Sequence, residues 1–277
     1  MRTTTENGEL ALLLEVSGTP KPGNVDRHRE YDDLRFEHFV TGAVCAREGL
    51  QLAADGTAVG EAFRRAVAGM SQQSGGNTQF GALLVVTPLV RAAVADELTP
   101  AGTRTILEET TVEDAAKFYE AFEYVDVAVD DPPDGMEPLD VRRGADAVPT
   151  LRAQEITLED LMERSADRDG VAAELVNGYP RTFEAAAAML DGTGPVTDRA
   201  ARAYLDLLAD EVDTFVVTKH DRETAEKVRQ RAQAVRDGEE DVDTFADDLV
   251  ERGINPGTTA DIVAGALFVA LERGLEV

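Results

Sequence analysis

The sequence predicts an all-α protein that forms a single globular domain over residues 1–277. Apolar residues recur at a spacing near 3.6 along most of the chain, which is the period of an amphipathic helix. No segment of useful length shows the alternation typical of a strand, and no fixed-period repeat or low-complexity tract divides the chain. With 277 residues, 43% of them hydrophobic, the chain can bury one large core.

The first third of the chain carries the clearest helical patterns. Residues 10–16 are apolar almost all round, which favours a buried helix. Apolar residues at helical spacing predict further helices over 33–52 and 57–70. The apolar segment 77–95 follows, and Pro88 within it predicts a kink.

Capping residues and helix breakers organise the rest of the chain. Thr111 is an N-cap candidate followed closely by two acidic residues, which predicts a helix to about Tyr124. Thr157 has the same role for the helix after it. The stretch 130–135, rich in Asp and Pro, predicts a surface loop after a short extended piece at 125–129. Further helices are predicted over 170–176, 181–190, 198–208, 221–235, 242–252 and 259–273.

Charge is the most unusual feature of the composition, because 54 acidic residues face 27 basic ones and the net charge is −27. Four of the basic residues are lysines: Lys21, Lys117, Lys219 and Lys227. No basic stripe is available to neutralise phosphates, so we expect no nucleic-acid partner. Molar salt shortens the screening length to about 3 Å and relieves the self-repulsion of such a chain. The acidic, lysine-poor composition therefore predicts a halophilic protein.

The sequence predicts a soluble, cytoplasmic protein without a membrane segment. Its single cysteine, Cys45, excludes a disulfide framework and fits a reducing compartment. The apolar stretch at 10–14 is too short for the apolar region of a signal peptide. The longest apolar run, 80–90, is interrupted by Thr87 and Pro88 and falls short of the roughly 18 residues that a membrane span needs.

One segment near the N-terminus surrounds Lys21 with two prolines. Pro20 and Pro22 fix their own φ angles, so the lysine sits on a stiffened loop. Glu15 ends an apolar helix, so we expect its carboxylate to be partly buried. A cation together with the carboxylates of Glu15 and Asp26 on rigid backbone suits a polyphosphate with a bridging Mg²⁺. The alternative is a stiff connection between helices with a solvated lysine.

Two further segments place polar residues before apolar helices. Gly75 and Gly76 precede Asn77 and Thr78, where glycines let a ligand approach and free amides at a helix start favour an anion. The alternative is an ordinary helix start after a turn. Asp261 is expected in the first turn of a buried helix, where the dipole stabilises its charge and its simpler role is to support the cap.

Several common catalytic patterns are absent from the sequence. It contains neither the glycine-rich dinucleotide fingerprint nor the phosphate loop that ends in Gly-Lys-Ser/Thr. The histidines, His28, His38 and His220, show no metal-ligand spacing, and Cys45 has no activating neighbour in the sequence. Zinc and thiol chemistry are therefore not expected.

Taken in order, the three segments resemble the triphosphoribosyl-dephospho-CoA synthase family. The family's Glu-Val-x-x-Thr-Pro-Lys-Pro-Gly-x-Val-Asp is matched by EVSGTPKPGNVD at residues 15–26. Its Asn-Thr-His-Lys-Gly corresponds to NTQFG at 77–81, and its Pro-Gly-Gly-Ser-Ala-Asp corresponds to PGTTAD at 256–261. Weaker similarities extend the resemblance over nearly the whole chain, at 111–115, 166–169 and 213–214.

The resemblance implies a transferase that moves the 5-triphosphoribosyl group of ATP to the 2'-hydroxyl of 3'-dephospho-CoA and releases adenine. ATP and a nucleotide-like acceptor are then the small-molecule partners, and Mg²⁺ is the expected cofactor. The predicted catalytic residues are Glu15, Asp26 and Asp261, and the first two are also the predicted Mg²⁺ ligands. The predicted residues for binding ATP and its phosphates are Lys21, Gly76, Asn77, Thr78, Arg168 and Lys219.

Departures from the family pattern leave alternatives open. Gln79 and Phe80 stand where the family has a His-Lys pair, which removes one phosphate-facing cation. Lys219 is a candidate to restore it. The same scaffold and ATP site could act on a different acceptor in another cofactor pathway, or the protein could be a non-catalytic nucleotide-binding interaction protein. The sequence leaves the acceptor, the pathway and the oligomeric state open.

Overall fold

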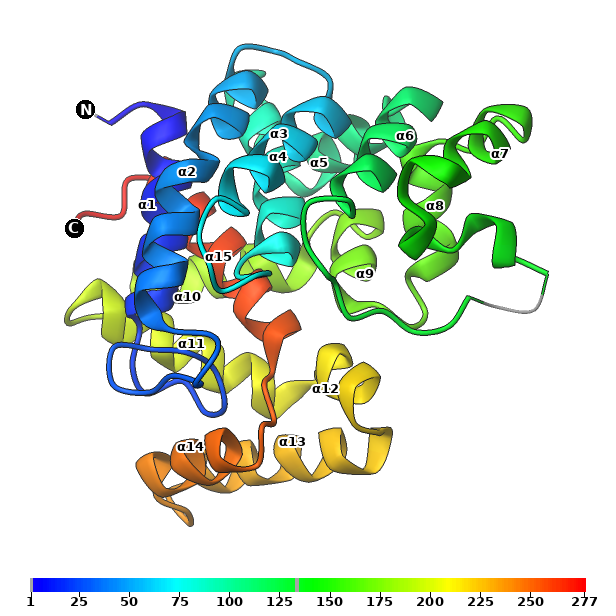
Figure 1. Ribbon diagram of the computed structural model, residues 1–277. Coiled ribbons are helices and arrows are strands. Elements are labelled where there is room, and N and C mark those ends of the chain that lie inside the picture. Colours follow the sequence, from blue (N-terminus) through cyan, green and yellow to red (C-terminus); the bar gives the residue numbers. More distant parts are fainter. Residues whose placement is uncertain (1, 133–134) are drawn as a thin grey trace.

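The computed structural model describes residues 2–132 and 135–277, and within them the chain forms helices joined by turns and loops, with no strand (Figure 1). This confirms the predicted all-α fold. The α-helices are α1 (Thr4–Ser17), α2 (Phe36–Ala54), α3 (Val59–Met70), α4 (Phe80–Val94), α5 (Pro100–Glu108), α6 (Val112–Ala121), α7 (Val148–Ala153), α8 (Leu158–Ser165), α9 (Gly170–Val176), α10 (Pro180–Asp191), α11 (Val196–Asp210), α12 (Thr214–Lys219), α13 (Arg222–Arg236), α14 (Val242–Glu251) and α15 (Gly257–Glu272). Two 3-10 helices, η1 (Glu137–Leu139) and η2 (Val141–Ala147), lie between α6 and α7.

Threonine side chains begin several of these helices. Thr3, Thr111 and Thr157 each accept a hydrogen bond from the amide three residues on. The carboxylate at that position in turn accepts a hydrogen bond from the backbone amide of the threonine. Such a cap contributes about 1 kcal/mol to the helix it begins. The caps predicted at Thr111 and Thr157 are confirmed. The cap at Thr3 starts the first helix earlier than predicted, because it precedes the apolar run.

Two apolar helices, α4 and α15, form the centre of the molecule. They pack against each other, and α1 contacts both of them (α15 is red in Figure 1). Gly265 allows the close approach, because a Cβ atom at this position would collide with Val85. Most residues of both helices are buried. Central position explains why their sequences are apolar on every face rather than on one stripe.

The other helices flank this centre in groups (Figure 1). α2 packs on α1 and α3, and α3 packs on α6. α6 in turn contacts α7 and α8. At the opposite end of the chain, α13 packs on α11 and α12. Among the described residues, no helix is both long enough and apolar enough to cross a lipid bilayer.

Some local predictions differ from the structure. The short extended piece at 125–129 is irregular, and α5, α7 and α12 were not predicted. Of the predicted surface loop at 130–135, residues 130–132 and 135 are loop or turn, and 133–134 lie outside the described residues. α15 begins at Gly257, which places Asp261 in the second helical turn and not the first.

Candidate active site

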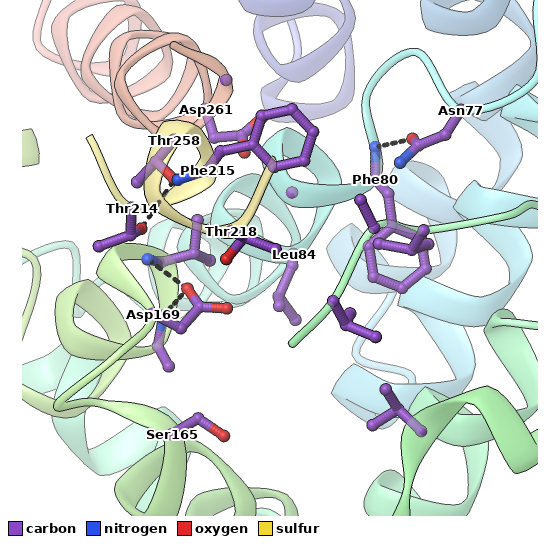
Figure 2. A pocket seen from close by; sticks show the side chains of 18 of the residues that line it. Asn77, Phe80, Leu84, Ser165, Asp169, Thr214, Phe215, Thr218, Thr258 and Asp261 are labelled. Carbon is purple, nitrogen blue, oxygen red and sulfur yellow. Dashed lines mark hydrogen bonds between the residues drawn. The ribbon is translucent and has the colours of Figure 1, made fainter. Parts of the chain in front are cut away.

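A cavity of about 350 Å³ lies beside the central helices. The first turns of α4, α9, α12 and α15 all contribute to its wall. Figure 2 shows Thr214, Thr258 and Asp261 on one side of this pocket and Asn77 and Phe80 on the other. Side chains pair with several amides at these helix starts, so what the four starts bring to the cavity is the positive end of each helix dipole.

Hydroxyl groups tie three of these helix starts together. Thr214 Oγ1 accepts a hydrogen bond from the Gly170 amide (2.9 Å) and lies 3.0 Å from Thr258 Oγ1. Thr258 Oγ1 in turn accepts a hydrogen bond from the Phe215 amide (3.2 Å). The starts of α9, α12 and α15 are therefore fixed relative to one another on one side of the cavity.

Two aspartates cap the short helices on this side. Asp169 accepts hydrogen bonds from two amides of α9. Asp213 caps α12 and also accepts from the Thr259 amide (2.8 Å) and hydroxyl (2.7 Å). Burial raises the pKa of the Asp213 carboxyl, and the hydrogen bonds from Thr259 offset part of that rise. Both oxygens of Asp213 therefore hold the wall together, whereas Asp169 uses Oδ1 for its cap and also lines the cavity.

Lys21 joins the N-terminal and C-terminal motif segments from behind the cavity. Its side chain is fully buried, forms an ion pair with Glu15 Oε1 and donates to Asn24 Oδ1 (3.0 Å). Asn24 donates to Asn255 Oδ1 (2.8 Å), and the ammonium lies 5.9 Å from the centre of the Tyr204 ring. Lys21 is therefore not a solvated surface lysine, and its charge is directed at the carboxylate of Glu15.

Asp26 holds the motif loop in place. Its two carboxylate oxygens accept hydrogen bonds from the Thr19 hydroxyl (2.9 Å) and from the amides of Lys21 (3.0 Å), His28 (2.8 Å) and Arg29 (3.0 Å). The side chain is 1% exposed and does not line the cavity. Its lone pairs are thus used within the loop.

A Mg²⁺ ion shared by Glu15 and Asp26 does not fit this arrangement. One oxygen of Glu15 is paired with Lys21, and both oxygens of Asp26 already accept hydrogen bonds. Within residues 2–132 and 135–277, no group of three or more His, Cys, Asp or Glu side chains could hold a metal ion. Asp26 therefore holds the loop and Glu15 lines the cavity, and we assign no metal to either residue.

Five of the nine site residues predicted from the sequence line the cavity. They come from segments far apart in the chain and are Glu15, Asn77, Thr78, Arg168 and Asp261. Asn77 Oδ1 accepts a hydrogen bond from the Phe80 amide (3.0 Å), so it caps the start of α4. Arg168 and Arg164 are the two basic residues of the lining.

The other four predicted site residues do not line the cavity: Lys21, Asp26, Gly76 and Lys219. Lys21 and Asp26 are buried behind it, as described above. Gly76 lies in an exposed turn at φ 70°, a backbone conformation that glycine adopts without strain. Lys219 is exposed at the end of α12, so it does not supply the cation that Gln79 and Phe80 lack.

Glu15 and Asp261 are two of the six acidic residues that line the cavity, and they are the two that come from the motif segments. Asp261 rests on Gly81, where a Cβ atom would occupy the place of its carboxylate. Burial, with added repulsion from Glu15, raises the pKa of Asp261 well above the usual range for aspartate. Burial also raises the pKa of Glu15, and the charge of Lys21 opposes that rise. The structure therefore favours a protonated Asp261 beside a Glu15 that Lys21 keeps closer to ionisation.

The aromatic part of the lining was not predicted from the sequence. The ring centre of Phe80 lies 4.8 Å from that of Phe122 and 6.3 Å from that of Phe118, and all three rings line the cavity. Phe118 and Phe122 are four residues apart at the end of α6 and resemble ordinary core residues in the sequence. Gln79 also lines the cavity and is 3% exposed. The mismatch with the family at Gln79 and Phe80 was the one available signal.

The fold and the cavity are those of an all-helical protein in which two acidic motif residues, Glu15 and Asp261, line a pocket among converging helix starts. The profile of the ATP:dephospho-CoA triphosphoribosyl transferase family (CitG) matches residues 1–276, and the chain belongs to this family. The crystal structure of an Archaeoglobus fulgidus protein assigned as a triphosphoribosyl-dephospho-CoA synthase is similar, with a TM-score of 0.68 and 26% sequence identity. The match covers 84% of this chain and 98% of that protein. A comparison with curated protein sequences finds no match.

Proposed function

We propose that the protein transfers the 5-triphosphoribosyl group of ATP to the 2'-hydroxyl of 3'-dephospho-CoA and releases adenine. The bond from ribose C1' to the adenine nitrogen breaks, and a bond from C1' to the acceptor oxygen forms. Such a displacement passes through a state with oxocarbenium character. The observation that carries the proposal is that Glu15, Asn77 and Asp261, one from each motif segment, line a single cavity.

Glu15 is the proposed general base of this reaction. Its Oε1 is paired with Lys21, and its Oε2 accepts no hydrogen bond from any described residue. Because Glu15 lines the cavity, Oε2 is the oxygen available to take the proton from the acceptor hydroxyl. Lys21 then acts as a positioning residue that fixes the carboxylate and favours its ionised form.

Asp261 is the proposed general acid. Its raised pKa favours the protonated form, which can donate a proton to a ring nitrogen as adenine leaves. The carboxyl is held against Gly81 at the start of α4, on the cavity wall. In one transfer Glu15 would therefore gain a proton and Asp261 would lose one.

The triphosphate requires positive charge that the cavity supplies sparingly. Arg164 and Arg168 are the basic residues of the lining, and the starts of α4 and α15 add their dipoles. Lys21 is enclosed behind Glu15 and does not reach the cavity. ATP would therefore enter with its own Mg²⁺ as a substrate complex, and the protein would contribute arginines and helix starts.

The decisive test is release of adenine from ATP, measured by liquid chromatography with purified protein in molar KCl. We expect release that depends on 3'-dephospho-CoA. If adenine release requires a different nucleotide-like acceptor, the protein is still a transferase but its acceptor is not 3'-dephospho-CoA. The departure from the family pattern at Gln79 and Phe80 is the reason to test other acceptors. ATP binding without adenine release for any acceptor would show a non-catalytic nucleotide-binding protein.

We also propose that the protein works in a very salty cytoplasm. Every ion pair uses one of only 27 basic residues, so many of the 54 acidic residues repel one another across the surface. Urea unfolding at increasing KCl should show a free energy of unfolding that rises into the molar range, because screening relieves that repulsion. A free energy of unfolding that stays constant down to low salt would contradict the proposal.

A further inference from the structure

Besides Glu15, the buried ammonium group of Lys21 has a second partner, the side-chain amide of Asn24. Lys21 Nζ lies 3.0 Å from Asn24 Oδ1. An ammonium group can only donate hydrogen bonds, so the oxygen of this amide must face the lysine and its nitrogen must face away. Asn24 Nδ2 then donates to Asn255 Oδ1 at 2.8 Å. Because the lysine fixes the orientation of the first amide, it also fixes that of the second.

Asn255 is the end of this chain of hydrogen bonds, on the cavity wall. Its side chain is half-buried and lines the cavity, as does that of Asn24. With Oδ1 used by Asn24, its Nδ2 has no hydrogen-bond partner among the described residues and is not enclosed by them. An amide nitrogen that is oriented in this way offers a hydrogen-bond donor to an oxygen atom of a ligand.

One ammonium group therefore organises an acceptor and a donor. It pairs with Glu15 Oε1, which leaves Oε2 as the available acceptor, and it orients Asn255 Nδ2 through Asn24. Glu15 and Asn255 line the same cavity. A hydroxyl group can use both, because it donates through its hydrogen and accepts through its oxygen. An ionised phosphate oxygen has no hydrogen to give to Glu15, so the arrangement suits an alcohol.

We propose that Asn255 and Glu15 together bind the sugar hydroxyl of the acceptor. This inference rests on the proposed function, in which Glu15 takes the proton of that hydroxyl. Negative charge develops on the oxygen as the proton leaves, and the Nδ2–H group of Asn255 stabilises it. The charge of Lys21 strengthens this donor through Asn24. Asn24 is thus a positioning residue, and the enclosed lysine acts on the acceptor without touching it.

The first experiment measures binding by calorimetry in molar KCl, with 3'-dephospho-CoA and its 2'-deoxy analogue as ligands. We expect the wild type to bind the analogue about tenfold more weakly, because the analogue lacks the hydroxyl that pairs with a carboxylate and an amide. Asn255→Ala should weaken binding of 3'-dephospho-CoA, reduce its advantage over the analogue, and leave the affinity for ATP unchanged. Equal affinity of the wild type for both ligands, or a loss confined to ATP, would overturn the proposal.

The second experiment uses Asn24→Asp to test the orientation of the chain. The new carboxylate still accepts from Lys21, but it presents an oxygen to Asn255, so that amide must turn and direct its own oxygen into the cavity. We expect a loss of 3'-dephospho-CoA affinity as large as in Asn255→Ala. This variant keeps the shape of the side chain, so it also tests the proposal if Asn255→Ala does not fold.

Combining the two changes separates the turned amide from the added charge. In the Asn255→Ala background, Asn24→Asp should cause little further loss of affinity, because no amide is left to turn. A further loss of full size would show that the carboxylate acts on the acceptor directly, and the proposed chain would be wrong. The control Asn177→Ala changes an exposed asparagine at the end of α9 and should leave both affinities unchanged.

These titrations require no turnover, so they can fail independently of the proposed reaction. Weaker 3'-dephospho-CoA binding in Asn255→Ala, with no adenine release by the wild type, would contradict the transfer and keep the hydroxyl subsite. Adenine release that depends on 3'-dephospho-CoA, with unchanged affinity in Asn255→Ala, would keep the reaction and overturn the subsite.

Discussion

Lys21→Met is expected to lower the free energy of unfolding by about 3–5 kcal/mol, because it leaves the buried carboxylate of Glu15 without its partner. The sequence left open a solvated lysine on a stiff connection, and such a lysine could be replaced with little loss of stability. Its full burial changes that expectation. Urea unfolding in molar KCl is the appropriate measurement, since guanidinium would alter the screening.

The double variant Lys21→Met/Glu15→Gln separates the ion pair from simple packing. Removing both charges should recover most of the lost stability, because no unpaired charge remains buried. The exposed pair of Lys227 and Glu223 provides the matched control, and Lys227→Met should cost less than about 1 kcal/mol. A loss at Lys21 that Glu15→Gln leaves undiminished would show that the lysine acts through its packing against Tyr204.

Activity should also distinguish a positioning role from a purely structural one. In folded Lys21→Met, Glu15 loses the charge that favours its ionised form, so its pKa should rise further. The rate of adenine release should then reach its plateau at a higher pH than in the wild type, with little change in KM for ATP. If Lys21 bound phosphate directly, its replacement by Met would raise the KM for ATP instead.

The fold was largely predictable because most helices carry both an apolar period and a cap. The Thr111 and Thr157 boxes mark helix starts that the structure confirms. α5 also had a usable signal, an N-cap at Thr99 followed by Pro100 at the first helical position. α12 has only six residues, and its start is stabilised by Asp213 and by contacts with α15 that no local pattern records.

The sequence segments that form the site could be predicted, but the directions in which their side chains point could not. Three motif segments were expected to share a site, and Glu15, Asn77 and Asp261 do line one cavity. The direction in which Lys21 points depends on Glu15 and on Tyr204 from α11, which the local sequence does not reveal. Whether an aromatic residue on α6 faces the core or a cavity is likewise decided by distant helices.

Asp261→Asn is expected to fold and to lose most adenine release, by about 10²–10⁴-fold, because it removes the proposed proton donor while keeping the shape. The exposed residue Asp198, in the first turn of α11, provides the matched control, since Asp198→Asn should leave turnover unchanged. Wild-type turnover in Asp261→Asn would show that another group, or water, protonates the leaving base.

The same variant should differ from the wild type in how its stability depends on pH. The folded state raises the pKa of Asp261 well above its unfolded value, so at pH values between the unfolded and the folded pKa the folded protein holds a proton that the unfolded chain has released. The contribution of this group is fully present below the unfolded pKa and is lost as pH rises toward the folded pKa. Asparagine does not titrate, so the variant should gain on the wild type from about pH 4 upward, as urea unfolding at several pH values would measure. A stability difference independent of pH would show that the Asp261 carboxyl is already ionised in the folded protein, and the proposed acid would then have no proton to give.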